Sequence, residues 1–188
     1  MSNTIKARLT GRLPLLMHNE RLANPLDQAA KDLKVITSKR KKTEDDMLAL
    51  SFAEFRGGLY IDEDGPYIPA HWMLAMIRDG AKLTKQGKDA IRAILLNDAK
   101  LPLIYSGPKD VDGLWKKGFF DRRMVGNQKA RVLRTRPKFA AWSVEFSLLF
   151  DESVFDRGQI ESILKTAGNM VGLGDYRPLF GRFSVEIL

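Results

Sequence analysis

Apolar and polar residues alternate strictly near both ends of the chain. Residues 5–13 place Ile5, Ala7 and Leu9 on one face and basic or hydroxyl side chains on the other, and residues 141–150 and 183–187 alternate in the same way. A period of two indicates a strand with one buried face. Between the last two strands, apolar residues at helical spacing predict a helix over about residues 156–170.

The middle of the chain combines helical spacing with turn residues. Asn24 and Thr43 have the residue types of helix N-caps, and Gly57 and Gly58 are typical of a helix end. The expected elements, in chain order, are helices over about 24–36, 43–57 and 70–83, a hairpin at 59–68, and strands at 90–96 and 101–105.

A strand, helix and strand at the carboxyl end form half of a split βαβ arrangement, and the opening strand with following helices can supply the other half. The fold class is therefore α+β: a ferredoxin-like (RRM-like) core with a large inserted helical and β-hairpin lobe. We expect a single domain over residues 1–188. Its core is assigned to 4–14 and 139–188, and the insertion to about 15–138.

Charge changes this picture, because it is concentrated in one segment. The chain has a formal net charge of +8, and residues 116–138 hold nine basic residues against one acidic residue, Asp121. The rest of the chain therefore sums to zero. Two strands, 119–125 and 130–136, are expected around a turn at Gly126–Asn127. The alternation slips between Val132 and Arg134, which predicts a bulge or a strand that leaves its sheet. This basic β-hairpin spans about 117–138.

Cations that hold phosphates, with aromatic rings that stack on bases, are what single-stranded nucleic-acid binding requires. A second basic run, in the loop before Thr43, is interpreted as a mobile phosphate-binding loop. For the hairpin the alternative is a solvated basic hairpin with two core phenylalanines. For the loop the alternatives are a mimic of a nuclear-localisation signal and a solvated linker. The candidate nucleic-acid-binding residues in these two segments are Lys39, Arg40, Lys41, Lys42, Lys117, Phe119, Phe120, Arg122, Arg123, Lys129, Arg131, Arg134, Arg136 and Lys138.

A glycine-rich stretch, GNMVGLGDYRPLFGRF, precedes the last strand. Together with the opening strand that ends at Pro14, it resembles the RAMP superfamily of CRISPR ribonucleoprotein subunits, above all the backbone subunits that carry a protruding hairpin. GLGDYRP is also similar to small uncharacterised phage and prophage proteins. The resemblance implies a ferredoxin-like core and places six further residues near a nucleic-acid strand: Gly172, Gly174, Tyr176, Arg177, Gly181 and Arg182. For Arg177 the alternative is an ion pair with Asp175 or another local carboxylate.

Several chemistries are not indicated by the sequence. There is no cysteine, no phosphate-binding P-loop and no metal-ligand spacing around His18 or His71, so no cofactor and no metal are expected. A pI near 9.7 indicates an anionic partner, with nucleic acid favoured over an anionic membrane surface. The absence of a signal-peptide pattern and of cysteine suggests the cytoplasm.

Three functions from different classes follow. The leading hypothesis is a sequence-tolerant protein that coats single-stranded DNA or RNA, of phage origin, and self-associates along the strand. The second is a metal-independent endoribonuclease of the RAMP type, in which His18 is the general base. The third is an interaction module or inhibitor that mimics a CRISPR subunit. The choice between DNA and RNA is left open, because it depends on contacts to the 2′-hydroxyl.

Overall fold

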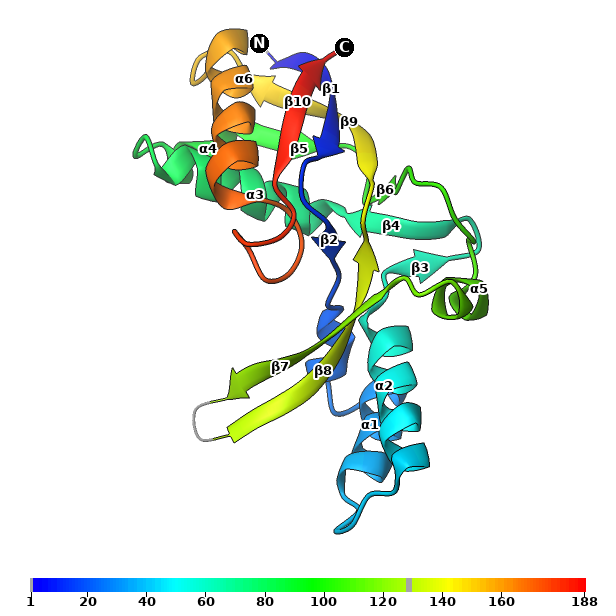
Figure 1. Ribbon diagram of the computed structural model, residues 1–188. Coiled ribbons are helices and arrows are strands. Elements are labelled where there is room, and N and C mark those ends of the chain that lie inside the picture. Colours follow the sequence, from blue (N-terminus) through cyan, green and yellow to red (C-terminus); the bar gives the residue numbers. More distant parts are fainter. Residues whose placement is uncertain (1, 128–129) are drawn as a thin grey trace. The chain divides into compact units, whose positions relative to one another are not determined.

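The computed structural model describes residues 2–127 and 130–188, and the chain divides into two compact units. Unit 1 contains the residues up to Leu15 together with Ile61–Ser106 and Ala140–Leu188. Unit 2 contains Leu16–Tyr60 and Gly107–Phe139. Each unit is therefore assembled from segments that are distant in sequence, and Figure 1 labels the elements of both.

A four-stranded antiparallel sheet forms the centre of unit 1. Its order is β10 (Phe183–Ile187), β1 (Ser2–Gly11), β9 (Ser143–Asp151) and β5 (Ile94–Leu96). Helix α3 (Ala70–Lys82) connects β1 to β5 in chain order, and α6 (Arg157–Thr166) connects β9 to β10. Two split βαβ units thus interlock, which is the ferredoxin-like arrangement and confirms the predicted α+β fold.

The core of unit 1 lies between one face of this sheet and the two helices. Residues at every second position of the strands are buried because the side-chain period is two, and Ala7 lies opposite Phe146. Helices α3 and α6 pack against each other beside the sheet. The residues that they bury are Met73, Met76 and Ile77 from α3, and Ile160, Ile163 and Leu164 from α6.

Two core elements, α3 and β5, come from the middle of the chain. The sequence prediction assigned this region to the insertion, whereas Ile61–Ser106 clusters with the terminal segments. The region also holds a small sheet of β3 (Ile61–Asp62), β4 (Gly65–Pro69) and β6 (Lys100–Pro102). The predicted strand 90–96 is wrong in its first half, because helix α4 (Gly87–Ala93) precedes β5 there. The side chain of Gln86 does not cap the start of this helix, and the edge strand that follows is short. The sequence therefore gives little signal to separate the helix from the strand.

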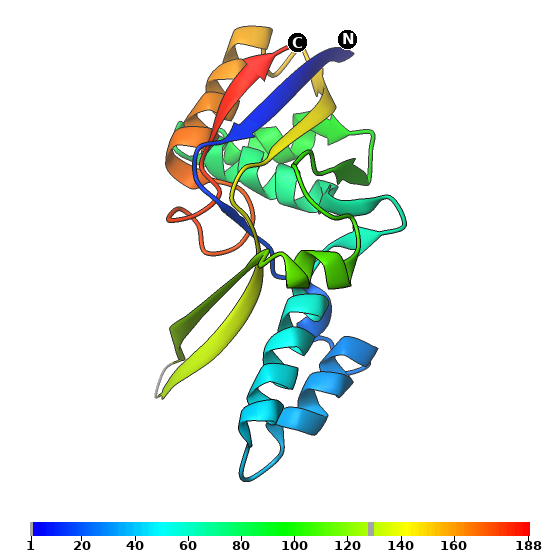
Figure 2. The ribbon, with the colours of Figure 1, turned by 45° about the vertical axis from the view of Figure 1, so that its right-hand side comes forward.

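Unit 2 combines a helical hairpin with a β-hairpin. Its elements are the 3-10 helix η1 (Glu20–Ala23), α1 (Gln28–Thr37), α2 (Glu44–Gly58), α5 (Val111–Lys116), β7 (Phe120–Asn127) and β8 (Ala130–Phe139). The short strand β2 (Leu15–Leu16) is shared, because Leu15 is counted with unit 1. The N-cap of α1 is Asp27 rather than the predicted Asn24, which instead ends η1. Thr43 is the N-cap of α2, as predicted, and it forms a capping box with Asp46. Helix α2 packs on β8, and Figure 2 shows the two hairpins diverging towards their tips.

The basic β-hairpin pairs without the predicted bulge. The register runs unbroken from Phe120 opposite Pro137 to Asn127 opposite Ala130. Gly126 and Asn127 therefore belong to strand β7, and the turn predicted at these two residues is wrong. Local propensity favoured a turn at Gly-Asn, but continuous cross-strand pairing extends the ladder past it. Residues 128–129, which include the predicted binding residue Lys129, lie outside the described residues.

Candidate nucleic-acid interface

The net charge of the protein belongs entirely to unit 2. Its segments hold 18 Lys and Arg against 10 Asp and Glu, whereas unit 1 holds 13 of each. Unit 2 therefore has a formal charge of +8 and unit 1 of zero. A field of this size on a small unit attracts anionic polymers.

A polar network fixes the β-hairpin to helix α2. The Arg122 Nε–H donates to Ser51 Oγ at 2.9 Å, and Ser51 Oγ lies 2.5 Å from Thr135 Oγ1. Ser51 and Thr135 are both buried. Because each buried hydroxyl has its partner on the opposite element, the hairpin is held against the helix at a defined register.

Aromatic rings pack under the base of the hairpin. Phe120 stacks on Trp115 with ring centroids 4.5 Å apart, and Trp115 also contacts Phe55 at 5.2 Å. Phe119 lies 5.7 Å from Phe139. The two phenylalanines predicted to stack on bases thus already have aromatic partners, as the core-phenylalanine alternative expects, and their role towards bases stays a prediction.

Two of the predicted binding cations are paired with carboxylates. Arg134 donates to the nearly buried Glu54 of α2 at 2.5 Å, and the same carboxylate accepts from the Thr135 N–H at 2.8 Å. Arg123 makes a two-pronged ion pair with Asp121. These two arginines therefore contribute less free positive charge than their number suggests.

Other cations of the hairpin are exposed to solvent. Lys117, Arg122 and Arg131 are exposed and Lys138 is half-buried. Within the described part of the chain, no carboxylate lies within ion-pair distance of these four residues. The guanidinium of Arg122 lies 5.1 Å from the centre of the Phe120 ring, so its charge is oriented but not neutralised.

The basic loop at the tip of the helical hairpin is partly committed to local contacts. Lys39 pairs with Asp46 at 2.6 Å, and the hydrogen bond from Lys39 lowers the pKa of Asp46. Lys42 Nζ donates to the carbonyls of Thr37 and Lys39 at 3.0 Å, which satisfies the carboxyl end of α1. Arg40 and Lys41 are exposed, and among the described residues neither has a recorded hydrogen bond or ion pair. The loop therefore offers two cations rather than four.

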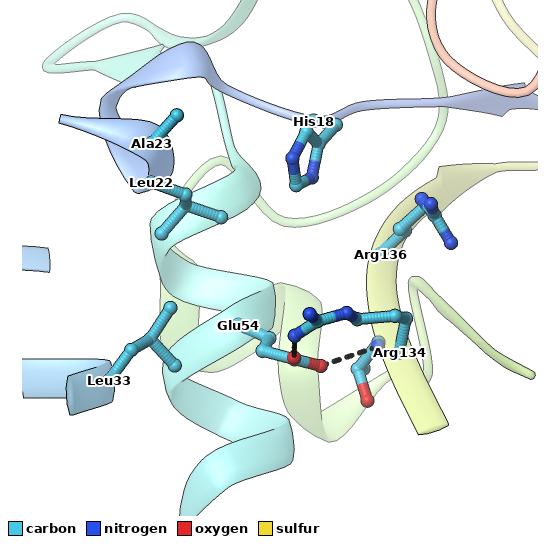
Figure 3. A pocket seen from close by; sticks show the side chains of 8 residues that line it. His18, Leu22, Ala23, Leu33, Glu54, Arg134 and Arg136 are labelled. Carbon is cyan, nitrogen blue, oxygen red and sulfur yellow. Dashed lines mark hydrogen bonds and ion pairs between the residues drawn. The ribbon is translucent and has the colours of Figure 1, made fainter. Parts of the chain in front are cut away.

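A cavity of about 240 Å³ opens within unit 2 (Figure 3). Arg134, Thr135 and Arg136 of β8 line one side, and Leu22, Ala23 and Leu33 from η1 and α1 line the other. Glu54 lies at its floor, and the imidazole of His18 projects into it. From the sequence, His18 belongs to the ribonuclease hypothesis and the hairpin arginines belong to the strand-binding hypothesis. In the fold, His18, Arg134 and Arg136 line the same cavity.

Backbone hydrogen bonds on either side of His18 fix its position. The N–H of the buried Met17 donates to the carbonyl of Pro137 on β8 at 3.0 Å. The N–H of Asn19 donates to the carbonyl of Gly58 at the end of α2, at 3.1 Å. His18 is therefore held between the two elements that build the cavity, although it lies in a segment without regular structure.

Glu54 is the site residue that the sequence analysis missed. Its only sequence signal is an acidic residue between Ser51 and Phe55, on the buried face of a helix where apolar residues are expected. Buried carboxylates are paired with cations or hydrogen-bond donors, so this position implied a partner. The partner itself lies 80 residues away and cannot be read from local spacing.

The glycine-rich loop of unit 1 closes tightly on itself. Gly172, Gly174 and Gly181 have φ values of 82°, 81° and 71°, which favour glycine. The N–H of Leu173 donates to the Gly181 carbonyl at 2.9 Å, and a Cβ at Gly181 would lie 1.7 Å from the Leu173 oxygen. These contacts give the glycines a structural role in loop closure, and their predicted proximity to nucleic acid stays untested.

The remaining loop residues also have contacts within unit 1. Arg177 lies 3.5 Å from Asp79 of α3 and 3.5 Å from the Gly172 carbonyl, so it makes an ion pair of the kind raised as the alternative. Arg182 donates to the Pro178 carbonyl at 3.0 Å. The Tyr176 ring lies 5.9 Å from Phe180. The loop is thus held to α3 and to itself.

The outward face of the ferredoxin-like sheet differs from an RNA-stacking platform. An RRM stacks bases on aromatic side chains that project from its sheet. In the described residues of this four-stranded sheet, the outward positions hold polar and charged residues together with Leu95 and Leu149, and no aromatic residue. Arg8 on this face is paired with Glu145 at 2.5 Å. The exposed cations of unit 2 are therefore the stronger candidate surface.

Two further properties concern the described residues alone. Across 2–127 and 130–188, no group of three or more His, Cys, Asp or Glu side chains lies close enough to hold a metal ion. None of the helices in these ranges has both the length and the apolar character needed to cross a membrane.

No protein-family model matches the chain, and no curated protein matches its sequence. Solved structures do match, among them a chain in the cryo-EM structure of the Type III-B Cmr-beta bound to cognate target RNA, with a TM-score of 0.52 and 12% sequence identity. The match covers 100% of this chain and 61% of the other, so this chain spans about three-fifths of that chain's length. The comparison supports a distant RAMP-like fold, and at this identity the likeness shows the fold alone.

Proposed function

We propose that the protein binds single-stranded nucleic acid through the basic hairpin of unit 2, with little dependence on sequence. The observation that carries this proposal is the confinement of the whole +8 charge to unit 2, with Lys117, Arg122 and Arg131 exposed. Lys and Arg side chains bind phosphates whatever the bases are. Pairing of Arg123 and Arg134 with carboxylates leaves the exposed residues as the main phosphate ligands.

The structural comparison supports a nucleic-acid partner. The matching chain belongs to a complex solved with cognate target RNA bound, and the likeness in fold covers the whole of the present chain. We extend the proposal to several copies of the protein along one strand, which would appear as cooperative binding. DNA and RNA are both within the proposal.

Two charge-matched double variants test the role of unit 2. Lys117→Ala with Arg131→Ala removes two exposed cations from unit 2, and Lys88→Ala with Arg92→Ala removes two exposed cations from unit 1. Each lost phosphate contact to a single strand lowers the slope of log K against log salt by about 0.7. We expect a slope decrease of about 1.4 for the first pair and little change for the second. Equal decreases for the two pairs would contradict the proposal.

A second candidate function is metal-independent RNA cleavage with His18 as the general base. The observation that favours it is the position of His18 in one cavity with Arg134 and Arg136, where a cation would stabilise a developing phosphorane charge. The test is incubation of single-stranded RNA and of DNA of the same sequence with a chelator present. RNA products that disappear in the His18→Ala variant support cleavage. RNA that stays intact under conditions in which it is bound would contradict cleavage and would be consistent with binding only.

A further inference from the structure

The cavity of unit 2 has one cationic side and one apolar side. Figure 3 shows Arg134 and Arg136 extending from β8, opposite Leu22, Ala23 and Leu33. An aliphatic wall adds nothing to the binding of an inorganic anion, and two arginines add nothing to the binding of a purely apolar ligand. The pairing of the two sides suits a ligand that is itself part anion and part flat apolar ring.

We propose that this cavity binds one nucleotide of the strand, with its phosphate on the arginine side and its base on the aliphatic side. This inference rests on the proposed function and specifies what one part of the interface holds. Guanidinium groups match phosphate geometry with paired hydrogen bonds, and His18 supplies a further polar group at the opening. The aliphatic side chains contact the base without reading its edge, so the site tolerates any base.

The size of the cavity suits a single unit. A volume of about 240 Å³ lies just below the roughly 300–1,000 Å³ of typical small-molecule sites. That space accommodates a nucleobase with part of its sugar but not a stack of bases. A pocket of this size therefore takes either a strand end or one nucleotide turned out of the stack.

Glu54 does not prevent phosphate binding at this place. Its two carboxylate oxygens already accept from Arg134 and from the Thr135 N–H. The carboxylate is thereby compensated, and it orients the Arg134 guanidinium across the cavity, as Figure 3 shows. The lining contains two arginines and one carboxylate, so its formal charge is positive.

The two histidines provide a direct readout. His18 projects into the cavity, whereas His71 lies on α3 in unit 1. We would titrate the full chain with adenosine 5′-monophosphate, adenosine and inorganic phosphate, and record the imidazole resonances by NMR. The monophosphate should shift His18 and leave His71 unmoved, with at least tenfold weaker effects from adenosine and from phosphate. Equal effects of phosphate and the monophosphate would overturn the role of the aliphatic wall.

A cavity-filling variant tests the aliphatic wall directly. Ala23→Leu adds volume at an exposed wall position and removes no polar partner, so the fold is expected to survive. It should weaken monophosphate binding at least tenfold with an unchanged amide spectrum. Full monophosphate affinity in this variant would contradict the proposal.

Competition with longer strands separates this inference from the proposed function. A linear oligonucleotide that displaces the monophosphate when a circular one does not identifies a strand end, and displacement by both identifies an extruded nucleotide. Oligonucleotide binding with no displacement overturns the pocket inference and keeps strand binding. Monophosphate binding without any oligonucleotide binding overturns the proposed function instead.

Discussion

Glu54 on α2 accepts a hydrogen bond from Arg134 on β8 while its own side chain is only 6% exposed. The pair joins the helical hairpin to the β-hairpin, and its two residues lie 80 positions apart in the sequence. An almost fully buried carboxylate needs such donors, because an unpaired charge away from water is costly. Arg134 is therefore first a structural residue of unit 2 and only second a candidate phosphate ligand.

Replacing Arg134 should destabilise the protein more than replacing an exposed hairpin arginine. Arg134→Ala leaves the Glu54 carboxylate with the Thr135 N–H as its remaining recorded donor, and we expect a loss of about 2 kcal/mol in the free energy of unfolding. Arg131→Ala, at an exposed position, should cost less than about 0.5 kcal/mol. Chemical denaturation of the two variants checks this, and equal losses would contradict a structural role for the ion pair.

The glycine-rich loop gives a second stability prediction. A Cβ at Gly181 would overlap the Leu173 carbonyl oxygen at 1.7 Å, and the φ of 71° disfavours other residues. Gly181→Ala should therefore cost more than about 2 kcal/mol. Gly126→Ala is the control, because a Cβ there has no heavy atom within 4 Å. Thermal unfolding compares them, and a Gly181→Ala variant as stable as the control would show that the loop can open without cost.

Asp79 predicts a pH dependence for unit 1. Burial raises its pKa, but hydrogen bonds from Arg78 and Lys82 outweigh burial and leave the pKa below its ordinary value of 3.8. The folded protein thus favours the carboxylate, so the stabilisation is complete above pH 3.8 and is lost as the pH falls through the lower folded value. Asp79 also lies 3.5 Å from Arg177, which connects α3 to the loop.

The Asp79→Asn variant measures this contribution. At neutral pH it should be less stable than the parent protein, and the difference in unfolding free energy should shrink as the pH falls below 3.8. Asp98→Asn, at an exposed site in the same unit, is the control. A difference that stays constant down to acidic pH would mean that the Asp79 charge does not stabilise the folded protein.

The sequence predicted the strands and helices whose own residues show the full alternation of a strand or the full apolar stripe of a helix. Strand β9 alternates over nine residues because one face is buried, and α6 shows its apolar stripe for the same reason. Strand β5 has three residues and follows a short helix, so its pairing of Ile94 with Phe150 has no local signal. The place of α3 and β5 in the core depends on that long-range pairing.

The same distinction applies to the candidate site. Clustered charge is visible in sequence, and its confinement to unit 2 agrees with the basic segment found there. Which cations are free is decided by partners on other elements, such as Glu54 for Arg134. The meeting of His18 with the β8 arginines depends on the Met17–Pro137 and Asn19–Gly58 hydrogen bonds, which spacing along the chain cannot indicate.

The most direct test of the account is a fluorescence-anisotropy titration of labelled single-stranded DNA, single-stranded RNA and duplex DNA at two salt concentrations. We expect tight binding to at least one single strand, a steep loss of affinity with salt because phosphate contacts release counterions, and much weaker binding to the duplex. Equal affinity for duplex and single strands, or no binding above nonspecific strength, would contradict the claim that the charge of unit 2 serves a single-stranded nucleic acid.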